Sequence, residues 1–121
     1  MSHRFDEGLR TIDQTIELIE ANGDCLYMPE ALRTKGAILL SMAQDLEEAA
    51  ESCFEQSLEW SRSQRALAWE LRTMTDLARL VAARGQSEKA RALLLPVIGQ
   101  FTEGFDTADL KAAERLLSAL A

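Results

Sequence analysis

Apolar residues recur along the chain at the spacing of amphipathic helices. A first stripe runs at positions i, i+3, i+7 and i+10 through Leu9, Ile12, Ile16 and Ile19. Asn22 and Asp24 flank Gly23, which suits the left-handed residue that follows a helix. The pattern therefore predicts a helix that ends near residue 22.

Turn and capping residues separate five further helical segments. Pro29 fits the first turn of the second helix, where its missing N–H costs nothing. Gly85 ends the fourth helix, we expect Ser87 to cap the fifth, and Pro96 predicts a kink within the fifth. The remaining breaks are predicted at Gln44-Asp45, at Arg62-Ser63-Gln64, and at Asp106 or Thr107. No strand pattern is present, so the sequence predicts an all-α fold.

The inner sides of these later helices are expected to carry mainly Leu and Ala. They comprise Leu32, Gly36, Leu39, Leu40 and Ala43 in the second helix; Ala50, Cys53, Phe54, Ser57 and Leu58 in the third; Leu67, Leu71, Met74, Ala78 and Val81 in the fourth; Ala90, Leu93, Leu94, Val97 and Phe101 in the fifth; and Leu110, Ala113, Leu116, Leu117 and Leu120 in the sixth.

Helices of the chain match one another at a regular offset. The third helix matches the fifth at an offset of 40 residues, and the first matches the third at an offset of 42. The matched positions are Ala50 with Ala90, Phe54 with Leu94, Gly8 with Ala50, and Ile12 with Phe54. One helix pair per period predicts an α-solenoid.

A small-x-x-large spacing before a glycine turn resembles the tetratricopeptide repeat. It is found in Ala78 and Val81, followed by residues 85–90, Gly-Gln-Ser-Glu-Lys-Ala. The period is longer than the usual 34 residues of that family. The resemblance implies antiparallel helix pairs in a right-handed superhelix of about six helices. It divides the single domain, 1–121, into an unpaired helix (1–23), two repeats (28–63 and 65–103) and a capping helix (106–121).

A longer stretch is similar to the C-terminal module of large bacterial proteins. Those proteins join an adenylate or guanylate cyclase domain, a P-loop ATPase domain and a tetratricopeptide array. The resemblance lies in residues 68–72 and 101–110, and its most specific part is Phe-Thr-Glu-Gly-Phe-Asp-Thr, 101–107. It implies a regulatory tail of such a signalling protein. The phosphate loop and the metal-binding aspartates of the catalytic domains are missing, so catalysis does not carry over.

Composition narrows the function further. The chain has 121 residues, a net charge of −7, 47% hydrophobic and 27% charged residues, which is typical of one globular domain. The negative charge disfavours nucleic-acid binding. Apolar runs are much shorter than the roughly 20 residues of a membrane span, and the first residues contain no apolar h-region, so we expect no secretory signal. Cys25 and Cys53 do not form a disulfide framework. We expect a cytoplasmic protein.

Residues for catalysis or metal binding are scarce. His3 is the one histidine, so a serine triad lacks a positioned base and a metal site lacks ligands. We therefore predict a protein that is not an enzyme and has no cofactor. Cys53 is expected to fill the core. A ridge at i+4 spacing, Glu47, Glu51, Glu55 and Glu59, is interpreted as a solvated face, with docking of a basic partner as the alternative.

The first helix of each tetratricopeptide pair lines a concave groove, and this pattern maps partner-binding residues onto the chain. They are Arg33, Thr34, Ile38 and Ser41 in one repeat, and Arg72, Thr75 and Arg79 in the next. Arg72 and Arg79 are two turns apart, hence on one side of a helix. Arginine binds carboxylates bidentately, which suits an acidic segment or a C-terminus. The alternative is that these arginines pair with Glu70 or Asp76 on the same helix.

Three functions remain open. The leading hypothesis is a scaffold that binds a protein or peptide partner. The second is a small-ligand sensor with a pocket between the repeats. The third is a dimerisation or capping unit, in which the unpaired first helix associates with a second copy through Leu9, Ile12, Ile16 and Ile19.

Overall fold

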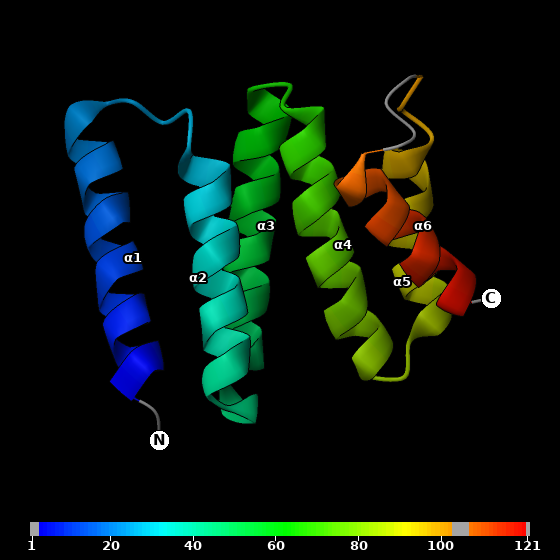
Figure 1. Cartoon of the computed structure of the whole chain (residues 1–121), viewed down its shortest axis with the longest axis horizontal. Helices are drawn as coiled ribbons and strands as arrows, with labels where there is room; N and C mark the ends of the chain where they lie inside the picture. The colour runs from blue at the N-terminus through cyan, green and yellow to red at the C-terminus, as the bar shows by residue number, and fades with distance from the viewer. Residues whose placement is uncertain (1–2, 103–106, 121) are drawn as a thin grey trace.

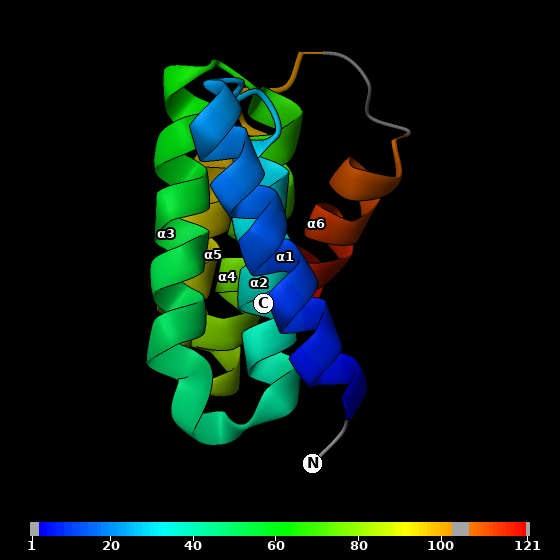
Figure 2. The same cartoon turned by 90° about the vertical axis from the view of Figure 1, so that its left-hand side faces the viewer.

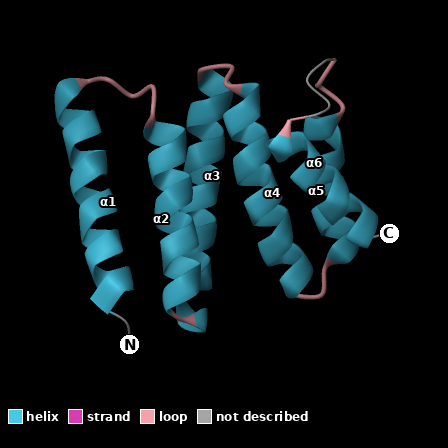
Figure 3. Cartoon of the chain, viewed as in Figure 1, coloured by secondary structure: helices cyan, strands magenta, loops and turns pink. Residues whose placement is uncertain are grey.

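The computed structural model of the chain describes residues 3–102 and 107–120. Within these ranges all regular structure is helical, which confirms the predicted all-α class (Figure 3). The helices are α1 (His3–Asn22), α2 (Met28–Met42), α3 (Glu47–Ser63), α4 (Leu67–Ala83), α5 (Ser87–Ile98) and α6 (Ala108–Ala119), with a short 3₁₀ turn, η1 (Gln44–Leu46), before α3.

The helices are arranged in layers around α4. Helices α3 and α5 form one layer and α2 and α4 a second, while α6 lies over the other side of α4 (Figures 1 and 2). Helix α4 contacts α2, α3, α5 and α6, whereas among the described helices α1 contacts α2 alone. The side of the second layer that faces away from α3 and α5 is therefore covered only in part, by α6.

Local chemistry explains most of the helix ends. Gly23 and Gly85 have φ of 71° and 81°, the left-handed conformation that glycine adopts without strain, and they follow α1 and α4. Pro29 lies in the first turn of α2. Thr107 caps α6, because its side-chain oxygen accepts a hydrogen bond from the Leu110 N–H. These predicted boundaries are confirmed.

Some predicted boundaries on α5 and α6 need correction. Ser87 is the first helical residue of α5 and not its cap; Gln86 precedes it, and no side-chain hydrogen bond caps this end. Helix α5 runs through Pro96 and ends at Ile98, so Phe101 lies beyond it, partly buried. Pro96 has no N–H to donate to the carbonyl of Ala92, so α5 lacks one backbone hydrogen bond there and ends two residues later. Asp106, the other proposed cap, is outside the described residues.

The core is centred on α3, α4 and α5. All five positions predicted on the inner side of α3 are buried, and Phe54, Leu71 and Leu94 are completely inaccessible. The matched positions Ala50 and Ala90, like Phe54 and Leu94, have an exposed fraction of 0%. None of the side chains described on α1 is fully buried. Helix α1 therefore adds a partly covered layer to a core built by the other helices.

A buried hydroxyl ties three helices together. The Ser57 Oγ on α3 donates to the Pro29 carbonyl of α2 at 2.7 Å and lies 2.8 Å from the Thr73 Oγ1 on α4. Both hydroxyl residues are completely buried. Since a buried polar group without a partner is costly, these bonds set how α2 and α4 lie against α3.

Candidate functional site

Two hollows meet between α2 and α4. The first has a volume of about 250 Å³ and the second of about 440 Å³. Arg33, Asp76 and Arg79 line both, so the two hollows adjoin at these residues. We refer to the two hollows together as the groove. Its other lining residues are Arg72, Thr75, Asp109 and Ala112 at the α6 end, and Ala37, Leu40, Ser41, Glu47, Phe54, Leu80 and Ala83 at the other.

The α6 end is held together by ion pairs in alternating order of charge. Arg72 of α4 donates to Asp109 of α6, from Nη2 at 2.9 Å and from Nε at 3.3 Å. Its Nη1 also lies 3.1 Å from Glu30 Oε2 on α2. Because α2 and α6 are not in direct contact, Arg72 connects them.

The alternation continues from α2 back to α4. Arg33 donates to both oxygens of Glu30, at 2.8 and 3.0 Å, and its Nη1 donates to Asp76 Oδ2 at 3.0 Å. Arg79 then donates to Asp76 Oδ1 at 3.2 Å. We call this series the ionic chain: Asp109, Arg72, Glu30, Arg33, Asp76 and Arg79.

The ionic chain shifts the pKa of Glu30, Arg33 and Arg72. Hydrogen bonds from Arg33 lower the pKa of Glu30, against the opposing effect of its partial burial. The hydrogen bonds to Glu30 likewise raise the pKa of Arg33, and those to Asp109 raise the pKa of Arg72. Glu30, Arg33 and Arg72 therefore stay charged at neutral pH.

Arg79 is the member of the ionic chain with the most freedom. It pairs with one carboxylate, whereas Arg33 and Arg72 each pair with two. Its side chain is 54% exposed, compared with 22% for Arg33 and 37% for Arg72. Arg79 is thus the cation of the groove that is most accessible to another molecule.

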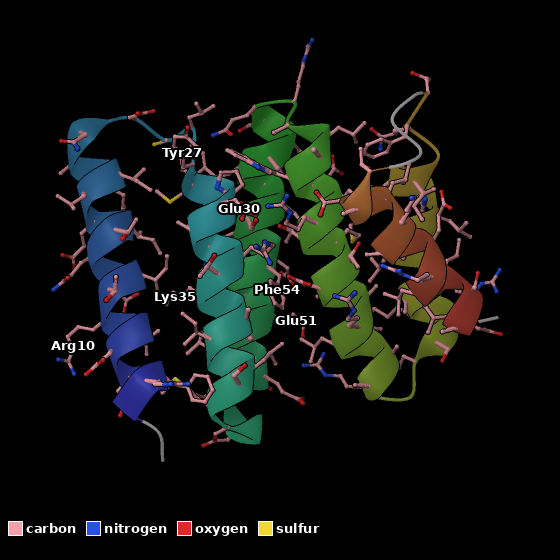
Figure 4. All side chains as sticks on the ribbon, in the orientation of Figure 1. Arg10, Tyr27, Glu30, Lys35, Glu51 and Phe54 are labelled. Atoms are coloured by element: carbon pink, nitrogen blue, oxygen red, sulfur yellow. The ribbon has the colours of Figure 1, made fainter. Side chains whose placement is uncertain are left out.

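The second hollow is mainly apolar. Leu40 of α2 and Leu80 of α4 flank it, and Phe54 of α3 lies beneath it, completely buried. In Figure 4, Glu30, Phe54 and Glu51 follow one another down the valley between α2 and α4. The groove therefore has an ionic end beside α6 and an apolar end between Leu40 and Leu80.

The structure brings most of the predicted groove residues together, namely Arg33, Ser41, Arg72, Thr75 and Arg79. Thr75 is buried and its hydroxyl donates to the Leu71 carbonyl, so it shapes the wall without offering a free donor.

Ile38 and Thr34 lie outside the groove lining. The Ile38 Cδ1 lies 3.5 Å from where a Cβ on Gly8 would be, so Ile38 faces α1. Thr34, four residues earlier, is on the same side of α2. Adjacent sides of α2 thus serve two neighbours, and the periodicity alone did not separate them.

The predicted self-association face is turned toward α2. Its members, Leu9, Ile12, Ile16 and Ile19, are all partly buried. Helix α1 is further fixed by an ion pair of 2.8 Å between Asp13 Oδ1 and Lys35 Nζ, and Lys35 lies between α1 and α2 in Figure 4. Leu18, which is 62% exposed, is outside the predicted stripe.

Sequence reasoning missed the carboxylates that complete the ionic chain. Glu30 lies three residues before Arg33 on α2, a spacing that could have predicted their pairing. Asp109 is 37 residues from Arg72, so only the fold brings them together. Asp76, considered as a local partner of the arginines, pairs with both Arg33 and Arg79.

Of the other candidates, only Glu47 of the acidic ridge also lines the groove. Arg84 binds Glu47 at 3.4 Å and Glu51 at 2.7 Å, so one cation pairs with two of the four ridge glutamates, while Glu55 and Glu59 are exposed. Cys53 is buried as expected, and Cys25 is in the loop before α2.

Nothing further in the described part of the chain indicates a metal or membrane site. Among residues 3–102 and 107–120, no cluster of His, Cys, Asp or Glu could hold a metal ion. None of the helices described there combines the length and the apolar character needed to cross a bilayer.

Comparison with known proteins adds no relative: no family model, curated protein or solved structure matches the chain.

Proposed function

We propose that the chain is a non-catalytic protein-interaction module whose groove binds a segment of a partner protein. The observation that carries the proposal is that two hollows adjoin between α2 and α4, since the same three residues line both. An open groove with an ionic and an apolar end offers a segment both orientation and apolar contact. The resemblance to the tail of cyclase and ATPase signalling proteins suggests a regulatory setting for such binding.

The rigidity of the lining supports this function. Arg33 and Arg72 are each held by two carboxylates, and the Phe54 ring is completely buried. Side chains that are already ordered lose little entropy when a partner binds, so weak contacts yield more affinity.

A small-ligand sensor is the second candidate. The volume of about 440 Å³ in the apolar hollow falls within the range of ligand pockets, roughly 300–1,000 Å³. The lining there mixes leucines with Arg79 and Glu47. The hollow is open along the valley, however, and an open groove buries an extended segment better than a compact ligand.

The test is selection of peptides from a random library displayed on phage, with the whole chain as target. Ala83 lines the apolar hollow and is exposed at the end of α4. We expect the Ala83→Trp variant to fill the hollow and to weaken the selected peptides at least about tenfold, the loss of about 1.4 kcal/mol.

Ala68→Trp is the matched control, because Ala68 is an exposed alanine of the same helix outside the groove. It should leave peptide affinity unchanged. Equal binding to both variants would show that the groove is not the binding site. Failure to select any peptide, together with specific binding of a small molecule that Ala83→Trp blocks, would favour the sensor.

A further inference from the structure

We infer that the partner segment carries a side-chain carboxylate that pairs with Arg79 and a bulky apolar side chain that enters the hollow above Phe54. This inference rests on the proposed function and specifies its ligand. It also assigns different roles to Arg33, Arg72 and Arg79, which the sequence analysis did not distinguish.

The first step is the incomplete end of the ionic chain. From Asp109 to Arg79 the charges alternate, and every inner member is flanked by two members of opposite charge. Within residues 3–102 and 107–120, Arg79 ends the series with Asp76 as its single carboxylate partner. An acidic side chain of a partner would continue the alternation at this end.

The second step is accessibility. A guanidinium group has five N–H donors in a planar fork. In Arg79, Nη1 donates to Asp76 at 3.2 Å, while more than half of the side chain is exposed. Arg33 donates to Asp76 on α4 as well as to Glu30 on its own helix, and Arg72 donates to Asp109 on α6. A ligand carboxylate can therefore bind Arg79 without displacing contacts between helices.

The third step is the neighbourhood of Arg79. The next residue, Leu80, and Leu40 across the valley flank the apolar hollow, and Arg79 lines this hollow as well as the ionic one. A segment whose carboxylate reaches Arg79 thus places an adjacent residue over Phe54. Burial of an apolar side chain supplies affinity, and the charge pair supplies orientation.

The experiment titrates the isotope-labelled chain with octapeptides, followed by amide chemical shifts. Each peptide has a Gly/Ser background with one Leu and one Glu at varied spacing, and matched peptides replace Glu by Gln or Leu by Ser. We expect shifts along residues 37–41 and 79–83 with the Leu and Glu peptides. Replacing Glu by Gln should weaken binding up to about fivefold, as for a partly exposed ion pair.

Variants of the arginines show which of them binds the carboxylate of the peptide. In Arg79→Gln the preference for Glu over Gln peptides should vanish, while the apolar contact still gives binding. In Arg72→Gln the preference should persist. Arg62→Gln is a control matched in exposure, since Arg62 is also 54% exposed and pairs with one carboxylate, Glu70, outside the groove.

Each outcome bears on one proposal. Peptides that shift the groove amides equally with Glu and with Gln overturn the inference about Arg79 and leave the groove as a binding site. Loss of the Glu preference in Arg72→Gln and not in Arg79→Gln also overturns it. The proposed function itself is contradicted if phage selection yields no peptide that binds in the groove. It is also contradicted if the peptides shift only amides outside the groove.

Discussion

Gly36 allows α2 and α3 to approach each other closely. A Cβ at this position would lie 2.6 Å from Phe54 Cε1 and 3.1 Å from the Ala50 carbonyl oxygen. Phe54 is completely buried, so its ring has little room to move. The sequence predicted Gly36 on the inner side of α2. The close contact with Phe54 depends on how the helices cross, which the periodicity does not determine.

We expect Gly36→Ala to lower the free energy of unfolding by about 1–3 kcal/mol, because overpacking outweighs the better helix propensity of alanine. Gly8→Ala is the control. Its Cβ would meet Ile38 at 3.5 Å, an ordinary contact, so it should raise stability by about 0.5–1 kcal/mol. Urea unfolding measures both values. If the two substitutions raise the free energy of unfolding equally, α2 and α3 do not pack closely at Gly36.

The two thiols differ in their surroundings. Burial raises the pKa of the Cys53 thiol, with the charge of Lys35 acting weakly in the opposite sense. Because the thiolate is the reactive form, Cys53 should react slowly in the folded protein. Cys25 is partly exposed in a loop. We expect a disulfide reagent such as DTNB to label one thiol rapidly in buffer and two in urea, and Cys25→Ser to abolish the rapid phase. Rapid labelling that persists in Cys25→Ser would contradict this.

At the scale of the elements, most helices follow from the sequence because their signals are local. Apolar periodicity, Pro29, Gly23 and Gly85 lie within or next to the helices they define. The fifth helix was predicted too long because Phe101 continues the apolar pattern beyond Ile98. Apolar periodicity records which residues are buried, and a buried residue after a helix fits the pattern equally well.

Contacts between side chains of different helices could not be predicted from the sequence. Arg72 was predicted in the groove, yet its partners Glu30 and Asp109 belong to two other helices. Which carboxylate of an acidic chain reaches a given arginine depends on helix placement. The same limit explains why Thr34 and Ile38 were assigned to the groove although that side of α2 faces α1.

Glu30 makes the packing of α2 on α4 dependent on pH. Its pKa is lowered in the folded protein, first of all by hydrogen bonds from Arg33. A lowered folded-state pKa means that the carboxylate stabilises the fold at pH values above its unfolded pKa, about 4.3. This contribution is lost as the pH falls through the lower pKa of the folded state.

We therefore expect Glu30→Gln to be less stable than the wild type at pH 7, and the difference to narrow as the pH falls below about 4.3. The protonated glutamic acid then resembles glutamine in charge. Urea unfolding across this range gives the difference, and Glu59→Gln on the exposed side of α3 is the control. A difference that stays constant with pH would show that the charge of Glu30 does not stabilise the fold.

For the whole molecule, the two ends of the helix array are covered differently. Helix α6 buries Leu110 and Ala113 against the core and joins the ionic chain through Asp109. Helix α1 lies at the other end, packs on α2 alone, and has no fully buried side chain among those described. Ala50 and Ala90, which lie 40 residues apart, are both completely buried in the middle of the molecule.

The mass of the protein in solution shows whether the chain is a monomer or a dimer that associates through α1. The apolar stripe that includes Ile12 and Ile16 is partly covered by α2, and the exposed positions Arg10, Gln14 and Glu17 are polar. A second copy would therefore meet a mainly polar surface, so we expect light scattering to give the mass of one chain, 13.5 kDa. Ile12→Glu with Ile16→Glu should then lower the protection of α1 amides from hydrogen exchange without changing the mass. A wild-type dimer that this double variant converts to a folded monomer would instead show that the stripe is an interface, and would favour the association function over the groove.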